Sequence, residues 1–264
     1  MQCLKKACPE AHCLYLADSV HFPYGTKSAE EVTECASSAV SLILKKWNPD
    51  AVVIACNTIS VTSLTELRRR FPQTPIVGTV PAIKLAAKVS VNRRIGLLAT
   101  EGTVHHPYTL DLEKKYAADC KIISRGDTAL VAFIEHDFFN AGPEERKKAV
   151  QPAVAYFAAN NCDTIVLACT HFIHVASVIA QEAGPAVKVV DSRDGVTRQA
   201  LKVVEDSGKR ENSIFNAVSD FLRDNAADES LFVTGFKDPD DFSEYRLLCS
   251  RLSIPWGGIV ELSV

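Results

Sequence analysis

The sequence lacks the features of several large protein classes. None of its apolar stretches approaches the roughly 20 residues that a membrane-spanning helix requires. Basic residues do not exceed acidic ones, and the net charge of -3 gives no electrostatic reason to bind nucleic acid or an anionic membrane surface. Lys5, Lys6 and Glu10 interrupt the region where a secretion signal would carry an apolar run. These absences predict a soluble, cytoplasmic protein.

Cysteine is abundant, but not in the patterns of disulfide-rich or zinc-binding proteins. The nine cysteines are an odd set without a C-x-x-C pair, which argues against a disulfide framework and against a zinc ribbon. A metal cluster of Cys3, Cys8, Cys13 and His12 is conceivable, but the even cysteine spacing fits neither common zinc pattern. We therefore expect reduced thiols, most of them small buried hydrophobic side chains, and no bound metal.

Strand-like and helix-like segments alternate along the chain. Short apolar runs predict buried strands at 12–18, 51–56, 75–78, 94–100, 121–124, 164–169 and 187–191. Amphipathic stretches between them predict helices over 28–47, around 64–67, over 103–116 and 142–160, and from 174. Ser28 and Glu31 form a capping box at the start of the first of these helices. The alternation predicts an α/β protein with parallel sheets covered by helices on both faces.

One phrase of sequence occurs twice, 113 residues apart. "DAVVIACNTI" begins at Asp50 and "DTIVLACTHF" at Asp163, and each ends an apolar run on a cysteine, Cys56 or Cys169. The repeat predicts an internal duplication that produced two pseudo-symmetric α/β domains with parallel sheets. Ligands of such sheets bind beyond the carboxyl ends of the strands. We therefore expect the two thiols to face each other across a cleft.

The repeat also predicts the domain boundaries. The first domain is expected to comprise residues 1–80 and 190–264 and to carry Cys56, and the second to comprise 81–189 and to carry Cys169. The second copy opens with a strand and a glycine-containing loop that have no counterpart in the first copy. The first domain is therefore expected to lack its opening strand and to leave an uncovered strand edge, which favours aggregation.

Two facing thiols suit the inversion of a stereocentre. A thiolate is a good base and the thiol it becomes is a good acid, so one group can remove an α-hydrogen while the other returns a proton from the opposite side. A cysteine that closes a buried strand is more often a packing residue, and a loop histidine such as His171 usually only satisfies its hydrogen bonds. The polar residues directly after both cysteines favour the catalytic interpretation, because they can hold a carboxylate or an ammonium group.

The chain resembles the cofactor-independent aspartate/glutamate racemase family over nearly its whole length. The segments that carry the resemblance are "ADSVHFPYGTKSAEEV", "ACNT", "VPAIK", "GLLATEGTV", "ACTHF" and "LFVTGFKDPDDF". The family implies interconversion of L- and D-glutamate without pyridoxal phosphate or metal, which supplies D-glutamate for peptidoglycan synthesis. No lysine lies in a motif that suggests a Schiff base. The sequence leaves the oligomeric state open, and a homodimer is among the assemblies it allows.

The resemblance also implies roles for individual residues. Cys56 and Cys169 are the two acid/base residues, and His171 supports Cys169. Glu135 matches an acidic residue that assists on the same side, although a glutamate on a helix surface is the commoner explanation. The residues implied in substrate binding are Tyr24, Gly25, Asn57, Thr58, Thr170 and His171.

The beginning of the sequence departs from the family. The family opens with a strand that leads into an Asp-Ser-Gly loop, whose aspartate assists the first cysteine and whose serine contacts substrate. Residues 1–18 contain no match to that loop. A start codon assigned too late and a genuine truncation both explain the difference, and the chain as written is expected to be poorly soluble and weakly active.

Two other functions remain open. One is a racemase for another amino acid such as aspartate; in that branch of the family glutamate tends to follow Cys-Thr, so His171 favours glutamate as substrate. The other is a truncated, non-catalytic, racemase-like binding protein. The intact pair of Cys56 and Cys169 argues against it.

Overall fold

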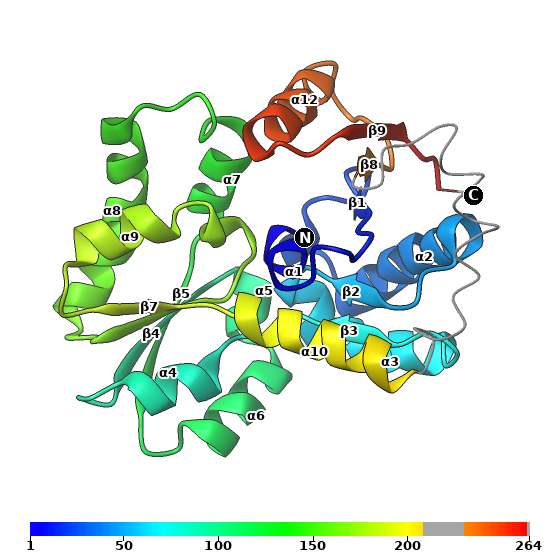
Figure 1. Cartoon of the computed structure of the whole chain (residues 1–264). Helices are drawn as coiled ribbons and strands as arrows, with labels where there is room; N and C mark the ends of the chain where they lie inside the picture. The colour runs from blue at the N-terminus through cyan, green and yellow to red at the C-terminus, as the bar shows by residue number, and fades with distance from the viewer. Residues whose placement is uncertain (208–229, 263–264) are drawn as a thin grey trace. The chain divides into compact units, whose positions relative to one another are not determined.

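The computed structural model describes residues 1–207 and 230–262 (Figure 1). Contacts between Cα atoms divide the chain into two compact units. Unit 1 comprises Met1–Val53, Thr65–Val77 and Arg193–Val264, and unit 2 comprises Ile54–Leu64 and Gly78–Ser192. In this division the segment that carries Cys56 groups with unit 2, whereas the sequence-based boundaries, which stay a prediction, place it in the first domain.

Unit 2 is built on a four-stranded sheet of order β5-β4-β6-β7. The strands are β4 (Arg94–Ala99), β5 (Lys121–Gly126), β6 (Thr164–Leu167) and β7 (Lys188–Val190), and all their pairings are parallel. β6 and nearly all of β4 are buried, as expected for central strands of a parallel sheet. The predicted parallel α/β arrangement is confirmed.

Helices cover both faces of this sheet. α4 (Ile83–Val89) and α6 (Pro107–Tyr116) lie on one face, and α8 (Pro143–Ala159) and α9 (Ala176–Ala183) on the other (Figure 1). On the first face, Ile83 of α4 packs in one core with Leu97 of β4. On the second face, Gly96 allows close approach of Phe157 from α8, because a Cβ at this position would lie 2.5 Å from the ring. The remaining helical segments are α5 (Glu101–Val104), α7 (Thr128–His136) and the single turn η2 (His171–Ile173).

The single helix predicted over 103–116 is wrong. α5 ends at Val104 and α6 begins at Pro107. Pro107 has no N–H and occupies the first position of α6, where an N–H would have no partner within the helix, so it suits the start of a new helix. His106 caps α6, since its Nδ1 accepts a hydrogen bond from the Tyr108 N–H at 3.2 Å.

Unit 1 contains two smaller sheets among its described residues. The three-stranded sheet has the order β1-β8-β9, with β1 (Tyr15–Ala17), β8 (Leu231–Val233) and β9 (Trp256–Ile259) all parallel. The two-stranded sheet pairs β2 (Val52–Ile54) with β3 (Ile76–Gly78). The strands are shorter than the apolar runs that predicted them.

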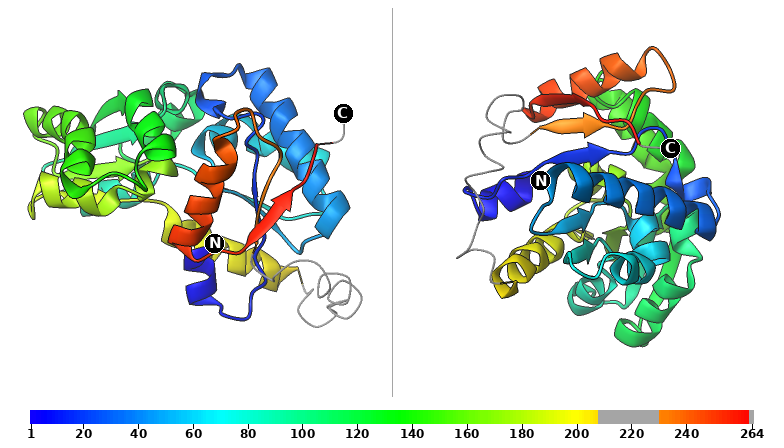
Figure 2. Two further views of the ribbon diagram at one scale, coloured as in Figure 1. Left: turned by 90° about the horizontal axis from the view of Figure 1, so that it is seen from above. Right: turned by 90° about the vertical axis from the view of Figure 1, so that its right-hand side faces the viewer.

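Two helices pack on opposite faces of the three-stranded sheet. α2 (Ala29–Trp47) covers one face, where Trp47 packs against Phe232, and α12 (Asp241–Leu252) covers the other, where Cys249 packs against Leu231 and Val233. The alternation along β8 follows from the two-residue period of a strand, and Figure 2 shows the three strands side by side. Ser28 and Glu31 form the predicted capping box of α2. The other helical segments of unit 1 are α1 (Gln2–Ala7), η1 (Tyr24–Thr26) and α10 (Arg193–Asp206), and α3 (Asn57–Arg70) begins in unit 2 and ends in unit 1.

The two copies of the sequence repeat differ in one strand. Adding the offset of 113 to β2 gives residues 165–167, which lie within β6. β6 pairs with β7 on one side and with β4 on the other, whereas within the described part of unit 1 β2 pairs with β3 and no strand takes the place of β4.

Across residues 1–207 and 230–262, no helix is long and apolar enough to cross a membrane.

Candidate active site

Cys169 lies at the carboxyl end of the central strand β6. The pairing of Leu98 with Leu167 sets β6 in register with β4, and the Ala168 N–H donates to the Leu98 carbonyl at 2.8 Å. Cys169 itself is buried. The chain then turns at once into η2, so Thr170 and His171 lie at the rim of the sheet. The expected position of the second cysteine, beyond a buried parallel strand, is confirmed.

A hydrogen-bonded chain links Cys169 to two further side chains. The His171 Nδ1 lies 3.4 Å from the Cys169 Sγ, and the His171 Nε2 is in hydrogen-bond contact with the Glu135 Oε1. Glu135 reaches the site from the last turn of α7, which packs against η2. Glu135 therefore contacts His171 and is not simply a glutamate on a helix surface.

This arrangement charges the imidazole. Burial alone would lower the pKa of His171, but the hydrogen bonds and negative charges of Cys169 and Glu135 outweigh burial and raise this pKa to about 10. His171 is then an imidazolium at neutral pH, and both of its ring nitrogens are donors. A neighbouring imidazolium favours the thiolate form of a cysteine. The geometry therefore places a cationic ring beside the Cys169 sulfur.

Cys56 has a different environment. It lies between β2 and the start of α3. Burial raises the pKa of its thiol to about 11, and the charge of Cys169 acts in the same direction, while hydrogen bonds from the Ile59 N–H and from Thr58 oppose the shift. Cys56 is therefore a thiol at neutral pH.

Asn57 and Thr58 open α3 directly beside Cys56. Both side chains are buried, at 3% and 6% exposure. The Asn57 Nδ2 has no hydrogen-bond partner among the described residues. A buried donor without a partner is costly, so this amide is suited to a ligand atom that accepts a hydrogen bond.

The Thr58 hydroxyl belongs to a triangle of threonines. Its Oγ1 lies 3.1 Å from that of Thr100 and 3.3 Å from that of Thr103, and the Thr100 hydroxyl donates to Thr103 at 3.1 Å. Thr100 directly follows β4, whereas Thr58 lies in the first turn of α3. Thr100 and Thr103 are absent from the site residues that the sequence predicts. Thr100 could have been predicted as a site residue, because it is a polar residue that follows an apolar strand, and the same kind of pattern led to Thr58.

The other residues implied in binding occupy two places. Thr170 is half-buried and occupies the N-cap position of η2 next to Cys169, where its side chain makes no capping hydrogen bond. Tyr24 and Gly25 belong to η1 in unit 1, where the Tyr24 ring is buried and its hydroxyl donates to Asp18.

Among the described residues, no group of three or more histidine, cysteine or acidic side chains is arranged to hold a metal ion.

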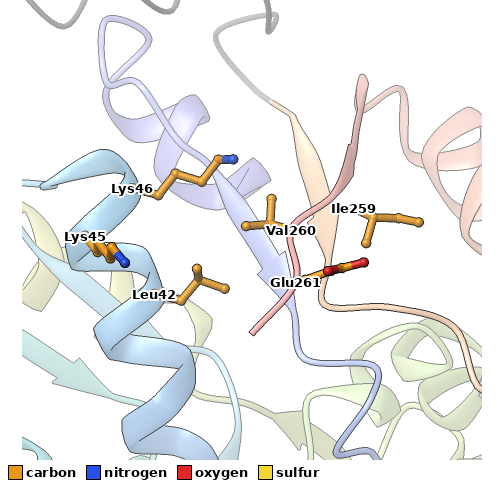
Figure 3. Close-up of a pocket in the computed structure, with 6 residues that line it drawn as sticks. All are labelled: Leu42, Lys45, Lys46, Ile259, Val260 and Glu261. Atoms are coloured by element: carbon orange, nitrogen blue, oxygen red, sulfur yellow. The ribbon is translucent and has the colours of Figure 1, made fainter. Parts of the chain in front are cut away.

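A surface hollow of unit 1 involves a different set of residues. Figure 3 shows it between α2 and the end of β9. It is lined by Leu42, Lys45, Lys46, Ile259, Val260 and Glu261. None of the residues implied in the reaction lines this hollow.

Comparison with known proteins identifies the family. The sequence model of the Asp/Glu/hydantoin racemase family matches residues 1–200. The chain belongs to this family. The resemblance inferred from the sequence motifs is thus confirmed.

Individual members of the racemase family match over most of this chain. The glutamate racemase of Treponema pallidum strain Nichols is 34% identical over 98% of this chain and 91% of its own length. That of Actinobacillus pleuropneumoniae serotype 7 is 38% identical over 96% and 88%. The crystal structure of Escherichia coli glutamate racemase with L-glutamate and the activator UDP-MurNAc-Ala has a TM-score of 0.79 at 29% identity, over 99% of this chain and 92% of that one.

Proposed function

We propose that this racemase interconverts L- and D-glutamate by acid/base catalysis with two cysteine thiols. The observation that carries the proposal is the unequal environment of the pair. Cys169 contacts an imidazolium, whereas the pKa of Cys56 is raised to about 11 by burial. The names of the similar proteins support glutamate as the substrate.

In the reaction one proton is removed from the α-carbon of the substrate and a different proton is added to the same carbon. The Cys169 thiolate takes the α-hydrogen as a proton, and the electron pair of the broken C–H bond is delocalised into the α-carboxylate. The Cys56 thiol then gives its proton to the opposite face of the α-carbon. The two cysteines have exchanged protonation states at the end, so the reverse reaction begins from the Cys56 thiolate and the Cys169 thiol.

His171 and Glu135 serve the Cys169 side of this cycle. The imidazolium stabilises the Cys169 thiolate before proton transfer, and Glu135 holds the ring in place and stabilises its charge. On the other side, the α3 N-terminus donates backbone hydrogen bonds to Cys56, which stabilises that thiolate when it forms.

Polar residues around the cysteines bind the substrate in this proposal. Asn57 and Thr170 are available to the substrate's polar groups, and Thr58 shares its hydroxyl with Thr100 and Thr103. Tyr24 and Gly25 contribute from η1, as the family resemblance implies. The reaction needs neither pyridoxal phosphate nor metal, so activity is expected to persist in the presence of a chelator.

The cellular setting follows from the product. D-Glutamate is required for peptidoglycan synthesis, so we place this activity in the cytoplasm, where the precursors of the bacterial cell wall are made. A homodimer stays a prediction that sedimentation of the purified protein tests.

Circular dichroism of the amino acid tests the substrate assignment. Loss of optical activity from either L- or D-glutamate, with little effect on either aspartate enantiomer, is the expected result. Preferential racemisation of aspartate would support the rival substrate. Binding of glutamate without any change in optical activity would support the non-catalytic alternative.

A further inference from the structure

A buried carboxylate lies directly after β1, outside the set of residues implied in the reaction. The Asp18 side chain is 9% exposed and contacts three donors. The Thr234 hydroxyl donates to its Oδ1 at 2.9 Å, the His21 Nδ1 lies 2.8 Å from its Oδ2, and the Tyr24 hydroxyl donates to the same Oδ2. Such a carboxylate is well satisfied and holds its partners firmly.

These contacts determine which part of Tyr24 is available to a ligand. The Tyr24 ring is buried and its hydroxyl is taken by Asp18. A contact of this segment with a ligand would therefore come from the backbone of the single turn η1 rather than from the Tyr24 hydroxyl. On its other side this turn leads through Lys27, whose N–H donates to the Tyr24 carbonyl at 3.3 Å, into the capped start of α2. The segment is therefore anchored by Asp18 at one end and by the helix cap at the other.

We propose that Asp18 is a positioning residue that fixes the backbone of Tyr24 and Gly25 for substrate binding. The inference rests on the proposed function, because it takes these two residues as part of the substrate site. Asp18 acts through the Tyr24 ring and does not touch substrate. Thr234 supports the carboxylate from the end of β8, since it donates to Asp18 and its N–H donates to the Ala17 carbonyl at 3.1 Å.

The substitution Asp18→Ala tests this role. It removes the acceptor and leaves the buried Tyr24 hydroxyl without this partner, so the turn is expected to shift or to open. KM for glutamate should rise on the order of tenfold, which corresponds to the loss of one good hydrogen bond. The kcat should stay within about twofold, because the cysteines are unchanged. Trypsin cleavage after Lys27 should become faster.

A double variant separates positioning from general damage. Removing both partners of a buried hydrogen bond costs less than removing one. Asp18→Ala combined with Tyr24→Phe should therefore have a KM closer to that of the wild type than Asp18→Ala alone. A purely structural role would lower Tm in Asp18→Ala and leave KM unchanged in both variants.

Asp163 offers a matched control. It is also a carboxylate with several donors, accepting from the Ser90 hydroxyl at 2.6 Å and from the Val91 and Asn92 N–H groups at 2.7 Å each. It precedes β6 and so lies at the end of the sheet opposite Cys169. Asp163→Ala should lower Tm without raising KM.

The outcomes separate the two claims. A wild-type protein that does not racemise glutamate overturns the proposed function and this inference with it. A wild-type protein that racemises glutamate, together with an Asp18→Ala variant whose KM is unchanged, overturns this inference alone. A raised KM in Asp18→Ala, partial rescue in the double variant and an unchanged KM in Asp163→Ala support it.

Discussion

The His171 Nδ1 lies 3.4 Å from the Cys169 Sγ, while the opposite ring nitrogen contacts Glu135. A histidine held between a sulfur and a carboxylate is charged over most of the accessible pH range, because its pKa is raised to about 10. Cys56 does not share this environment: burial dominates there and raises the pKa of its thiol to about 11. The two thiols thus lie in different electrostatic environments.

Stability should decline at alkaline pH because of His171. Its pKa is about 10 in the folded protein and about 6.5 in the unfolded chain. The stabilisation is therefore complete below about pH 6.5 and is lost as pH rises toward 10. His171→Gln should reduce the free energy of unfolding at pH 7 and flatten its fall between about pH 7 and 10, as measured by urea denaturation.

The neighbouring His174 has a pKa shift opposite to that of His171, so it affects stability at acidic rather than alkaline pH. Burial and the positive charge of His171 lower the pKa of His174, so its contribution weakens stability as pH falls below about 6.5. Because this His174 effect is confined to pH below about 6.5, the difference between the wild type and His171→Gln above about pH 7 reports the His171 contribution. An equal alkaline decline in both proteins would contradict the charged state of His171.

Cys56 and Cys169, the proposed acid/base pair, should each be indispensable for racemisation. Cys56→Ala and Cys169→Ala should each lower racemisation by on the order of 10²–10⁴-fold or more, the usual contribution of one acid/base group. Folding should be little affected, because the change removes one sulfur atom. Cys162→Ala is the control: Cys162 is also buried but precedes β6, and its replacement should leave kcat nearly unchanged. Near-normal activity in either of the first two variants would refute the two-thiol mechanism.

Glu135→Gln should shift the pH dependence of activity. The negative charge of Glu135 helps to raise the pKa of His171, so a neutral amide should move the alkaline limb of the kcat profile to lower pH. The variant keeps the size of the side chain and one hydrogen-bonding oxygen. A pH profile that coincides with the wild type would show that Glu135 does not act through His171.

Asn57→Ala should separate binding from stability. The Asn57 Nδ2 has no partner among the described residues, so its removal should cost little free energy of unfolding. The same change should weaken glutamate binding, by about 1–3 kcal/mol if the amide donates to a substrate carboxylate. Asn92→Ala is the matched control, since the Asn92 Nδ2 donates to the Asn161 carbonyl at 2.8 Å. It should lower Tm and leave KM unchanged.

Much of the fold can be predicted because the strands are short apolar runs with polar ends. The sequence repeat also indicates that Cys56 and Cys169 lie just beyond strands, because the apolar run stops at each of them. The break between α5 and α6 escapes prediction because helical periodicity continues across Pro107, and a proline alone does not mark a helix start, since Pro152 lies inside α8.

Contacts between distant parts of the chain cannot be predicted in the same way. The Thr58 triangle depends on the contact between the end of β4 and the start of α3. The anchoring of Asp18 depends on the pairing of β1 with β8, which brings Thr234 to Asp18 although the two residues are 216 positions apart in the sequence. The contact of Glu135 with His171 depends on the packing of α7 against η2. None of these distances is encoded in local sequence periodicity; the family resemblance alone indicated Glu135.

Racemisation in heavy water tests the two-thiol account most directly. The reaction is started from L-glutamate and stopped early, and the α-hydrogen of each enantiomer is measured by mass spectrometry after chiral separation. Separate acid and base predict that the D-glutamate formed carries deuterium, while the remaining L-glutamate keeps its original hydrogen. Equal deuterium in both enantiomers from the earliest times would mean that one group both removes and returns the proton, and would contradict the assignment of Cys56 and Cys169 to opposite faces.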